Sequence, residues 1–332
     1  MEPRLKRAAA TIMRKIIHLC LSSHDEVMFR SDADLVIGFN SLALKSYQTE
    51  SRVLADGFMT THHHSLVQTD DPYLLMRRFR YCYTRYFNGK YKRKGSLGEK
   101  KWFVLEIEGA YHLQTALNYV MRQGLHHGLA STPFGYRHCS ANVIFRKELG
   151  KNDDPVLIED DQIFKYLPDR HTLPKGWRMD KSGLILREDV IDTSYVEQVY
   201  ITPKNFLFQM NRLTDEKVAD DQKKENTLPP VTLDSIENGV PGFDVQAALV
   251  NEQGRINRSI MTDLELCHII DDVLLTRYIK DPEEQSIYLL PVAKRHDLGN
   301  KLWQASNESY KKNNLLGGKT VSSSQIRRCL AI

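Results

Sequence analysis

Three consecutive histidines, His62, His63 and His64, are the residues of this sequence best suited to chemistry. Residues 65–68, which follow them, are compatible with a β-strand, and side chains along a strand alternate between its two faces. We therefore expect His62 and His64 on one face and His63 on the other. Two imidazoles spaced in this way can hold one divalent cation. The alternative is a polar strand end or loop that happens to be rich in histidine.

Tyr119 and Gln123 form a second candidate group, because residues four apart on a helix share one face and a helix is expected over residues 110–126. If that face lies over the strand with His62 and His64, the amide of Gln123 could supply an oxygen ligand to the same cation. The hydroxyl of Tyr119 would then lie beside the cation. A tyrosine, with a pKa of about 10, is a weak nucleophile at neutral pH, but a cation that polarises a phosphate helps a positioned phenol to attack it. The alternative is that both side chains serve only packing and solvation.

Between these two groups lies a segment, residues 77–101, that is rich in cations and aromatic rings and contains one acid, Glu99. Cations bind phosphates and aromatic rings stack on unpaired bases, so this composition predicts binding of single-stranded or hairpin nucleic acid. The candidate nucleic-acid-binding residues are Arg77, Arg78, Arg85, Tyr86, Lys90, Arg93 and Lys94. The alternative is a basic helix face that is merely solvated.

The elements that must position these residues follow from hydrophobic periodicity and from turn and capping signals. The expected order is strand, helix, strand, strand, helix, strand, helix, over residues 16–21, 32–47, 52–58, 62–69, 70–87, 102–107 and 110–126. The fifth of these, a helix, should stop before Asn88-Gly89. This order predicts an α+β fold with a ferredoxin-like antiparallel sheet and helices on one face, followed by a mostly helical C-terminal region.

The chain divides into three expected regions, because its character changes after Phe145. They are an N-terminal domain over residues 1–147, which holds the predicted sheet, an irregular connecting region over residues 148–234 and a helical region over residues 235–332. A charged linker is expected at residues 215–230. Helical patterns occur at residues 263–279, 283–293 and 323–330. The last has a serine-capped start and the basic residues Arg327 and Arg328, which would suit the recognition helix of a helix-turn-helix or an ordinary terminal helix.

Composition places the chain among soluble proteins of the cytoplasm. The 332 residues are 41% hydrophobic and 27% charged, with a formal charge of +4. The five cysteines are scattered and odd in number, which favours reduced thiols over a disulfide framework. The apolar run at residues 16–21 is too short for a signal peptide, and no stretch approaches the length needed to span a membrane.

Three motifs, in this order, carry a family resemblance. Residues 58–67, Phe-Met-Thr-Thr-His-His-His-Ser-Leu-Val, resemble the HUH motif (histidine, usually a hydrophobe, histidine) of single-tyrosine transposases, including the REP-associated tyrosine transposases. Residues 84–88, with 93–97 after them, are similar to the basic segment of that family. Residues 119–123, which run into Gly128-Leu129, are similar to its catalytic tyrosine helix. The resemblance covers residues 16–140.

The resemblance implies an enzyme that cuts and rejoins single-stranded or hairpin DNA through a 5′-phosphotyrosine. It implies His62, His64 and Gln123 as ligands of Mg²⁺ or Mn²⁺ and Tyr119 as the nucleophile. A homodimer is one expected state, because relatives include dimers, and no membrane partner is expected because no stretch of the chain approaches membrane-spanning length. His63 departs from the family pattern, as do Thr60-Thr61 and Gly124-Leu125, where Pro-Asn and Pro-Val are common. The rival hypotheses are a non-catalytic DNA-binding regulator derived from such a transposase, and a metal-dependent hydrolase without a covalent step.

Overall fold

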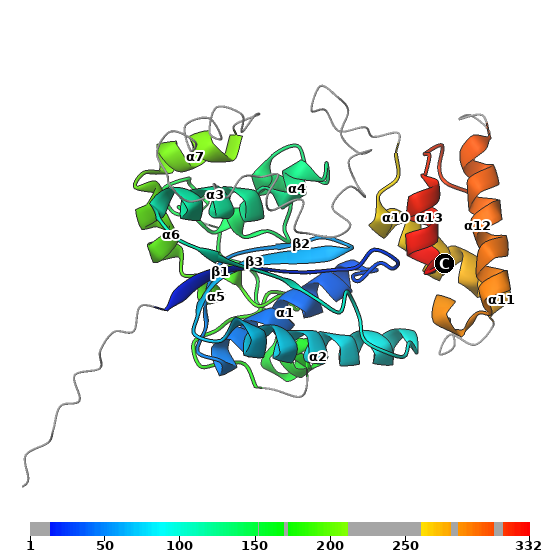
Figure 1. Ribbon diagram of the computed structural model, residues 1–332, viewed down its shortest axis with the longest axis horizontal. Helices are drawn as coiled ribbons and strands as arrows, with labels where there is room; N and C mark the ends of the chain where they lie inside the picture. Colours follow the sequence, from blue (N-terminus) through cyan, green and yellow to red (C-terminus); the bar gives the residue numbers. More distant parts are fainter. Residues whose placement is uncertain (1–13, 152, 169–171, 212–259, 280–284, 309–314) are drawn as a thin grey trace, which may run out of the picture.

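A four-stranded antiparallel sheet forms the centre of the protein. The computed structural model describes residues 14–151, 153–168, 172–211, 260–279, 285–308 and 315–332. The strands are β1 (Lys15–Ser22), β2 (Arg52–Phe58), β3 (His62–Thr69) and β4 (Phe103–Ile107). Their order across the sheet is β2-β3-β1-β4, with every neighbouring pair antiparallel (Figure 1). This confirms the α+β class and the ferredoxin-like strand order.

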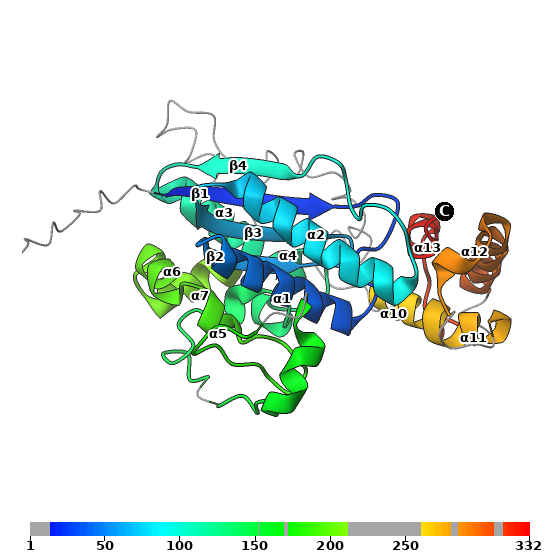
Figure 2. The ribbon, with the colours of Figure 1, turned by 90° about the horizontal axis from the view of Figure 1, so that it is seen from below.

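Helices cover both faces of this sheet. The helices α1 (Asp32–Gln48) and α2 (Pro72–Tyr91) pack side by side on one face, and α3 (Ala110–Met121) packs on the opposite face against β2 and β3 (Figures 1 and 2). The expectation of helices on one face therefore holds for the two crossover helices and not for α3. That difference matters because α3 carries Tyr119.

The ends of the first two helices follow from local chemistry. Ser31 caps α1 in a reciprocal capping box with Asp34. Asp71 caps α2, with proline at the first helical position. The prediction that this helix stops before Asn88-Gly89 is wrong, because α2 continues to Tyr91. The Tyr91 hydroxyl donates to buried Asp34 at 2.7 Å, so a tertiary contact overrides the local turn signal.

Two further predicted helices differ from the structure. The helix expected over residues 110–126 breaks at Arg122, and its last turn is a separate helix, α4 (Gln123–His126). The helix expected over residues 283–293 is wrong: a 3₁₀ turn occupies Ile287–Leu289, and α12 (Val292–Asn307) begins only after Pro291. The linker expected at residues 215–230 lies outside the described residues.

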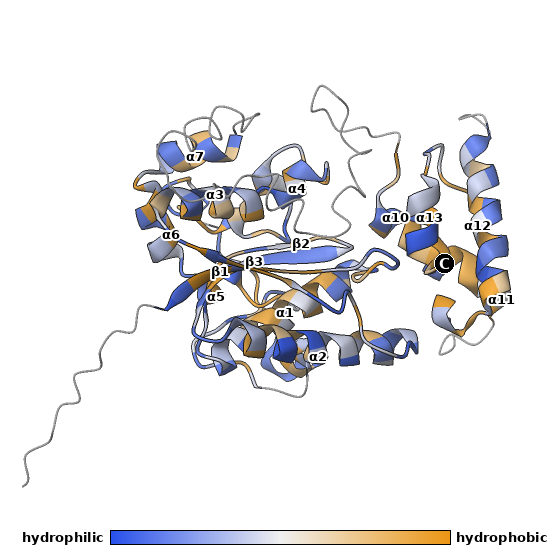
Figure 3. Cartoon of the chain, viewed as in Figure 1, coloured by the Kyte–Doolittle hydropathy of each residue, from blue (hydrophilic) through white to orange (hydrophobic). Residues whose placement is uncertain are grey.

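The C-terminal helices form a second unit with its own hydrophobic core, and this confirms the expected helical region. Its other helices are α10 (Asp263–His268), a π-helical segment (Ile269–Leu274), α11 (Leu275–Tyr278) and α13 (Ser323–Leu330). The core of the unit includes Leu266, Leu302 and Ile326, together with Val27 from the loop between β1 and α1. Figure 3 shows α12 as largely hydrophilic on the side in view, with hydrophobic residues on α11 and at the end of α13.

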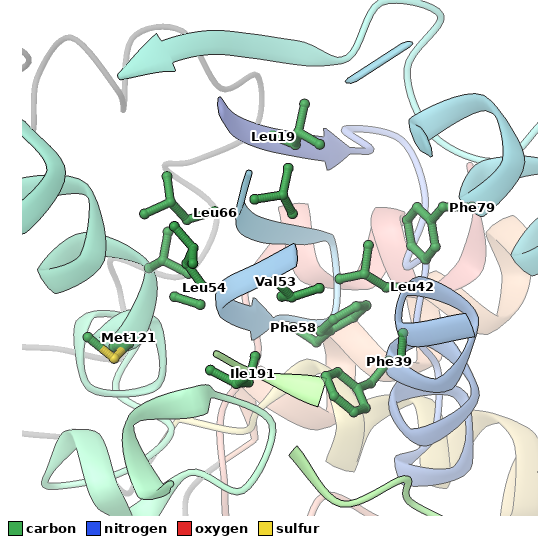
Figure 4. Packing of buried hydrophobic residues seen from close by; sticks show 14 of the residues in the cluster. Leu19, Phe39, Leu42, Val53, Leu54, Phe58, Leu66, Phe79, Met121 and Ile191 are labelled. Atoms are coloured by element: carbon green, nitrogen blue, oxygen red, sulfur yellow. The ribbon is translucent and has the colours of Figure 1, made fainter. Parts of the chain in front are cut away.

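The segment after α4 belongs to the same core as the sheet. Its elements are α5 (Arg187–Val190), α6 (Thr193–Tyr200), α7 (Pro203–Asn211) and 3₁₀ turns at Pro133–Gly135, Ser140–Asn142 and Asp160–Tyr166. Ile191 forms a β-bridge with Val53 of β2, and it lies in the cluster that contains Phe39 and Phe58 (Figure 4). Residues of the expected connecting region thus help to build the sheet's hydrophobic core.

Two expectations from the sequence concern the cysteines, expected as reduced thiols, and the absence of a membrane-spanning stretch. All five cysteines are free and buried. No helix in the described part of the chain is long and apolar enough to cross a membrane.

A buried ion pair fastens this later segment to the sheet. The guanidinium of Arg187, at the start of α5, donates to both carboxylate oxygens of Asp56 in β2 at 3.0–3.1 Å. The same guanidinium lies 4.1 Å from the ring centroid of Phe39 and also donates to the carbonyl of Arg137. Burial raises the pKa of Asp56, and the charge of Arg187 opposes that rise. The carboxylate therefore depends on Arg187 to remain ionised.

Replacing Arg187 with methionine should lower the free energy of unfolding by about 3–5 kcal/mol, because the Asp56 carboxylate is then left without its counter-charge in the core. Since the raised pKa favours the protonated carboxyl in the folded state, the loss should shrink as the pH falls. Urea unfolding at several pH values measures both effects. Arg52→Met is the matched control: this arginine of β2 is 53% exposed and pairs with Asp192, so its loss should stay below about 1 kcal/mol. Equal losses in the two variants would contradict this role of Arg187.

Candidate active site

Side-chain alternation along β3 separates the three histidines. The ring of His64 lies 5.1 Å from that of Tyr119 on α3, between ring centroids. The ring of His63 lies on the other face, 4.5 Å from that of Phe79 on α2 and 5.1 Å from that of Phe58. His62 is on the α3 side, with its ring centroid 5.0 Å from that of His64. The structure therefore confirms the expected alternation, with His62 and His64 on one face of β3 and His63 on the other.

The paired histidines each use one ring nitrogen within the protein. His62 Nδ1 lies 3.0 Å from Thr61 Oγ1, and His64 Nδ1 lies 3.0 Å from His18 Nε2. The Nε2 atoms of His62 and His64 are buried and make no hydrogen bond. Histidine ligands of metals commonly hold one nitrogen on a neighbouring group and offer the other to the ion. This pair has that arrangement.

Tyr119 and Gln123 are brought to the same place, although they lie on two successive helices. Gln123 is the first residue of α4, and its Nε2 donates to the carbonyl of Tyr119 at 3.2 Å. Its Oε1 lies 3.1 Å from His127 Nε2. The four predicted residues of the chemical site are therefore adjacent, with the amide oxygen already in contact with a further histidine.

Two histidines of this cluster were not predicted. His18 of β1 lies on the α3 side of the sheet, diagonally across from His64 in the β1–β3 pairing, in which Leu66 is its direct partner. The ring of His127, just after α4, is 5.1 Å from that of His62. The sequence signal for His127 is its position four residues after Gln123, which places both on one helical face. His18 has no such local signal.

A glycine sets how closely the tyrosine helix approaches the sheet. Gly57 of β2 pairs with His64 and lies under α3. A Cβ at this position would be 2.8 Å from the backbone oxygen of Val120, next to Tyr119, and 3.3 Å from the Gln123 side chain. A larger residue would push the helix away, since a backbone oxygen cannot turn aside. The glycine thus allows Tyr119 to reach the histidines.

Burial keeps these imidazoles neutral. It lowers the pKa of His62 to about 4 and that of His18 to about 3, and the nearby side chain of Gln123 partly opposes the shift at His62. Burial and the neighbouring histidines lower the pKa of His64 and His127 well below the ordinary value. Metal ligation requires neutral imidazole, so the environment favours the form that can bind a cation.

The donor set fits a divalent cation in part. The described residues contain no group of three or more His, Cys, Asp or Glu side chains arranged to hold a metal ion. An ion here would be held by Nε2 of His62 and of His64 with the amide oxygen of Gln123. Imidazole suits several transition metals and carbonyl oxygen suits Mg²⁺ and Mn²⁺, so the set is compatible with Mn²⁺ and would leave positions for phosphate oxygens. The site is enclosed, and Tyr119 is only 4% exposed.

The candidate nucleic-acid residues are not part of this cluster. They lie on α2 and the loop after it, across the sheet from Tyr119. Arg77, Arg78, Arg85 and Lys94 are exposed. The guanidinium of Arg85 lies 5.7 Å from the ring centroid of Tyr81, which is 64% exposed. This exposed aromatic ring was not among the predicted residues.

The other three candidate residues make contacts within the protein. The Tyr86 hydroxyl donates to Asp34 at 3.0 Å, and Lys90 Nζ donates to the same carboxylate at 2.6 Å. Arg93 forms a two-pronged ion pair with Glu26. These three side chains therefore hold α2 and its following loop to α1 and the β1–α1 loop.

The C-terminal basic helix is also largely committed to internal contacts. Ser322 caps α13, as its sequence predicts, and forms a capping box with Gln325. Arg328, however, is buried and donates to both carboxylate oxygens of Asp263. Only Arg327 of the two arginines is exposed, so the helix does not present the paired basic residues expected of a recognition helix.

Comparisons with known proteins add one observation. No protein-family model matches the chain, and no curated protein matches it. Among solved structures it is similar to a REP-associated tyrosine transposase bound to a REP hairpin, with a TM-score of 0.34 and 10% identity, over 42% of this chain and 81% of that one. Similarity at this level does not assign a family or an activity.

Replacing each of two neighbouring histidines with leucine should separate their roles. His64→Leu should abolish Mn²⁺ binding, because it removes one of the paired Nε2 atoms, whereas His63→Leu should retain it. His63→Leu should also stabilise the fold by roughly 1–3 kcal/mol, because both ring nitrogens of His63 are buried without a hydrogen-bond partner. Calorimetric titration with MnCl₂ and thermal melting measure the two effects. The reverse pattern of Mn²⁺ binding would contradict the alternation.

Proposed function

We propose that this protein is a metal-dependent endonuclease and transposase that cuts and rejoins single-stranded DNA through Tyr119. One observation carries the proposal: Tyr119 packs beside His64, in a cluster where two buried imidazoles each have an Nε2 without a hydrogen bond. A phenol next to a divalent-cation donor set is suited to attack on a phosphodiester. The motif resemblance to HUH single-tyrosine transposases agrees with this assignment.

In the covalent step assigned to Tyr119, one bond to phosphorus forms and one breaks. Its hydroxyl oxygen forms a bond to the scissile phosphorus and loses its proton, while the bond from phosphorus to the 3′ oxygen breaks. The 3′ oxygen takes up a proton, leaving a 3′-hydroxyl and a 5′-phosphotyrosine. Because the phosphoester is conserved, attack by a 3′-hydroxyl can reverse the step and rejoin DNA. A bound Mg²⁺ or Mn²⁺ would supply charge stabilisation of the phosphate oxygens.

The remaining residues of the cluster position these groups. His18 and Thr61 each hold one Nδ1 atom and so fix the orientation of the paired rings. Gln123 is held by the backbone of Tyr119 and by His127, which places its amide beside the rings. Since Tyr119 is almost fully enclosed, the proposal requires α3 and α4 to move away from β3 when DNA enters.

The burial of the site supports a second candidate, a DNA-binding protein in which the histidine cluster is structural. In that case DNA would contact only the exposed basic face of α2, and no cleavage would occur. The two candidates differ in one product, the covalent adduct.

Tyr119→Phe should bind DNA normally and form no covalent complex, because the ring and its packing remain while the nucleophilic oxygen is absent. The measurement uses labelled hairpin oligonucleotides with randomised single-stranded flanks, incubated with Mn²⁺ and separated on a denaturing gel. Tyr47→Phe is the control, since this exposed tyrosine of α1 lies away from the site. An adduct formed equally by Tyr119→Phe would refute the tyrosine mechanism, and its absence from the unaltered protein would favour the second candidate.

The exposed arginines of α2 should carry the salt dependence of DNA binding. Replacing Arg77, Arg78 and Arg85 with glutamine should reduce the log–log slope of affinity against salt by roughly 0.7 for each phosphate of a single strand that the protein no longer neutralises. Fluorescence anisotropy over a salt series measures that slope. Arg93→Gln is the control: because Arg93 pairs with Glu26, it should lower the melting temperature and leave the slope nearly unchanged. An unaltered slope in the triple variant would place the DNA elsewhere.

A further inference from the structure

The C-terminal unit contacts the loop between β1 and α1, beside the central sheet. In both ribbon views α10 and α13 lie at the end of the sheet where the β1–α1 loop emerges (Figures 1 and 2). Arg30 of that loop is buried and donates to the carboxylate of Asp271 at 2.7 and 2.9 Å and to the carbonyl of Cys329 at 2.7 Å. The backbone N–H of Val27 donates to the carbonyl of Arg328 at 3.3 Å. The two units are thus joined by buried polar contacts.

One of these contacts reaches the residues just before His62. Thr60 Oγ1, in the loop between β2 and β3, donates to Asp263 Oδ2 at 3.2 Å. Asp263 is the first residue of α10. Its carboxylate accepts hydrogen bonds from the guanidinium of Arg328 at both oxygens and from Gln325 Nε2 at 3.2 Å. A buried carboxylate with this many donors has little freedom to move. The Thr60 hydroxyl therefore binds a fixed point of the C-terminal unit.

The backbone of the β2–β3 loop is also hydrogen-bonded to the loop between β1 and α1. The carbonyl of Thr60 accepts from the N–H groups of Met28 and Phe29 at 2.8 and 2.9 Å, and that of Thr61 accepts from Ser23 at 2.9 Å. The Thr61 hydroxyl contacts His62 Nδ1 at 3.0 Å. Thr60, which bonds to the C-terminal unit, and Thr61, which contacts the ring of His62, are thus adjacent residues of a loop whose backbone is held by hydrogen bonds.

We propose that Asp263 and Thr60 are positioning residues, through which the C-terminal unit holds the imidazole of His62 in its ligating orientation. This inference rests on the proposed function for its use of a metal, but the orientation of the ring can be measured without one. It also gives the C-terminal unit a role other than DNA recognition, in agreement with the burial of Arg328.

The test uses Thr60→Val in the full chain, which keeps the β-branched shape and removes the hydroxyl. In the metal-free protein with ¹⁵N-labelled histidine, the ring resonances of His62, assigned by their loss in His62→Gln, should shift. The dissociation constant for Mn²⁺ should rise about 3- to 10-fold, below the 10- to 100-fold typical of a direct partner of a ligand. Thr61→Val, which removes that direct partner, should raise it by about 10-fold or more.

Two further variants separate positioning from general stability. Thr60→Ser restores the hydroxyl and should restore both the His62 resonances and the Mn²⁺ affinity. Thr276→Val removes an exposed hydrogen bond, from the Thr276 hydroxyl to the carbonyl of Val273, elsewhere in the C-terminal unit. It should change neither the His62 resonances nor the Mn²⁺ affinity. Arg328→Lys keeps the charge but cannot make the two-pronged bond to Asp263. It should shift His62 in the same direction by a smaller amount, and it replaces Thr60→Val if that variant does not fold.

The outcomes distinguish this inference from the proposed function. Unshifted His62 resonances in Thr60→Val, or the same change in Thr276→Val, would overturn the positioning role. If the unaltered protein does not bind Mn²⁺, the metal-dependent function fails, and the His62 resonances alone decide the inference: a shift supports it and no shift overturns it.

Discussion

The pleat of β3 is the constraint on which the site depends. Because successive side chains point to opposite faces, His62 and His64 meet α3, while His63 enters the aromatic packing under α2. Hydrogen bonds to β1 and β2 on either side fix this register, and a shift by one residue would exchange the two environments. The sheet thus supports the hydrophobic core and also places the three consecutive histidines in two different environments.

The two faces of the sheet carry different kinds of polar chemistry. Between the sheet and α3 lie neutral imidazoles, an amide and a phenol, enclosed and held to one another. On the opposite side, α2 turns charged side chains outward and fastens its inner ones to Asp34 and Glu26. If the α3 face carries out catalysis and the α2 face binds DNA, one DNA strand would have to pass around an edge of the β-sheet to reach both.

The sequence predicts the elements well where local signals and burial agree. The bounds of β2 and β3, the start of α1 and the whole of α13 follow from alternation and capping. The end of α2 does not, because Tyr91 bonds to Asp34, a residue distant in sequence. In the site, the residues on β3 and the tyrosine helix could be predicted from local spacing. His18 could not, because its contact with His64 depends on the register between β1 and β3, which only the folded sheet defines.

The missing side chain of Gly57 limits how this site can vary. The addition of one methyl group already brings a carbon to 2.8 Å from a backbone oxygen of the tyrosine helix. No smaller substitution exists, so the separation of helix and sheet cannot be adjusted gradually at this position. A lineage that altered the geometry between phenol and imidazoles would have to do so through residues of the helix itself, while the strand beneath it stayed as it is.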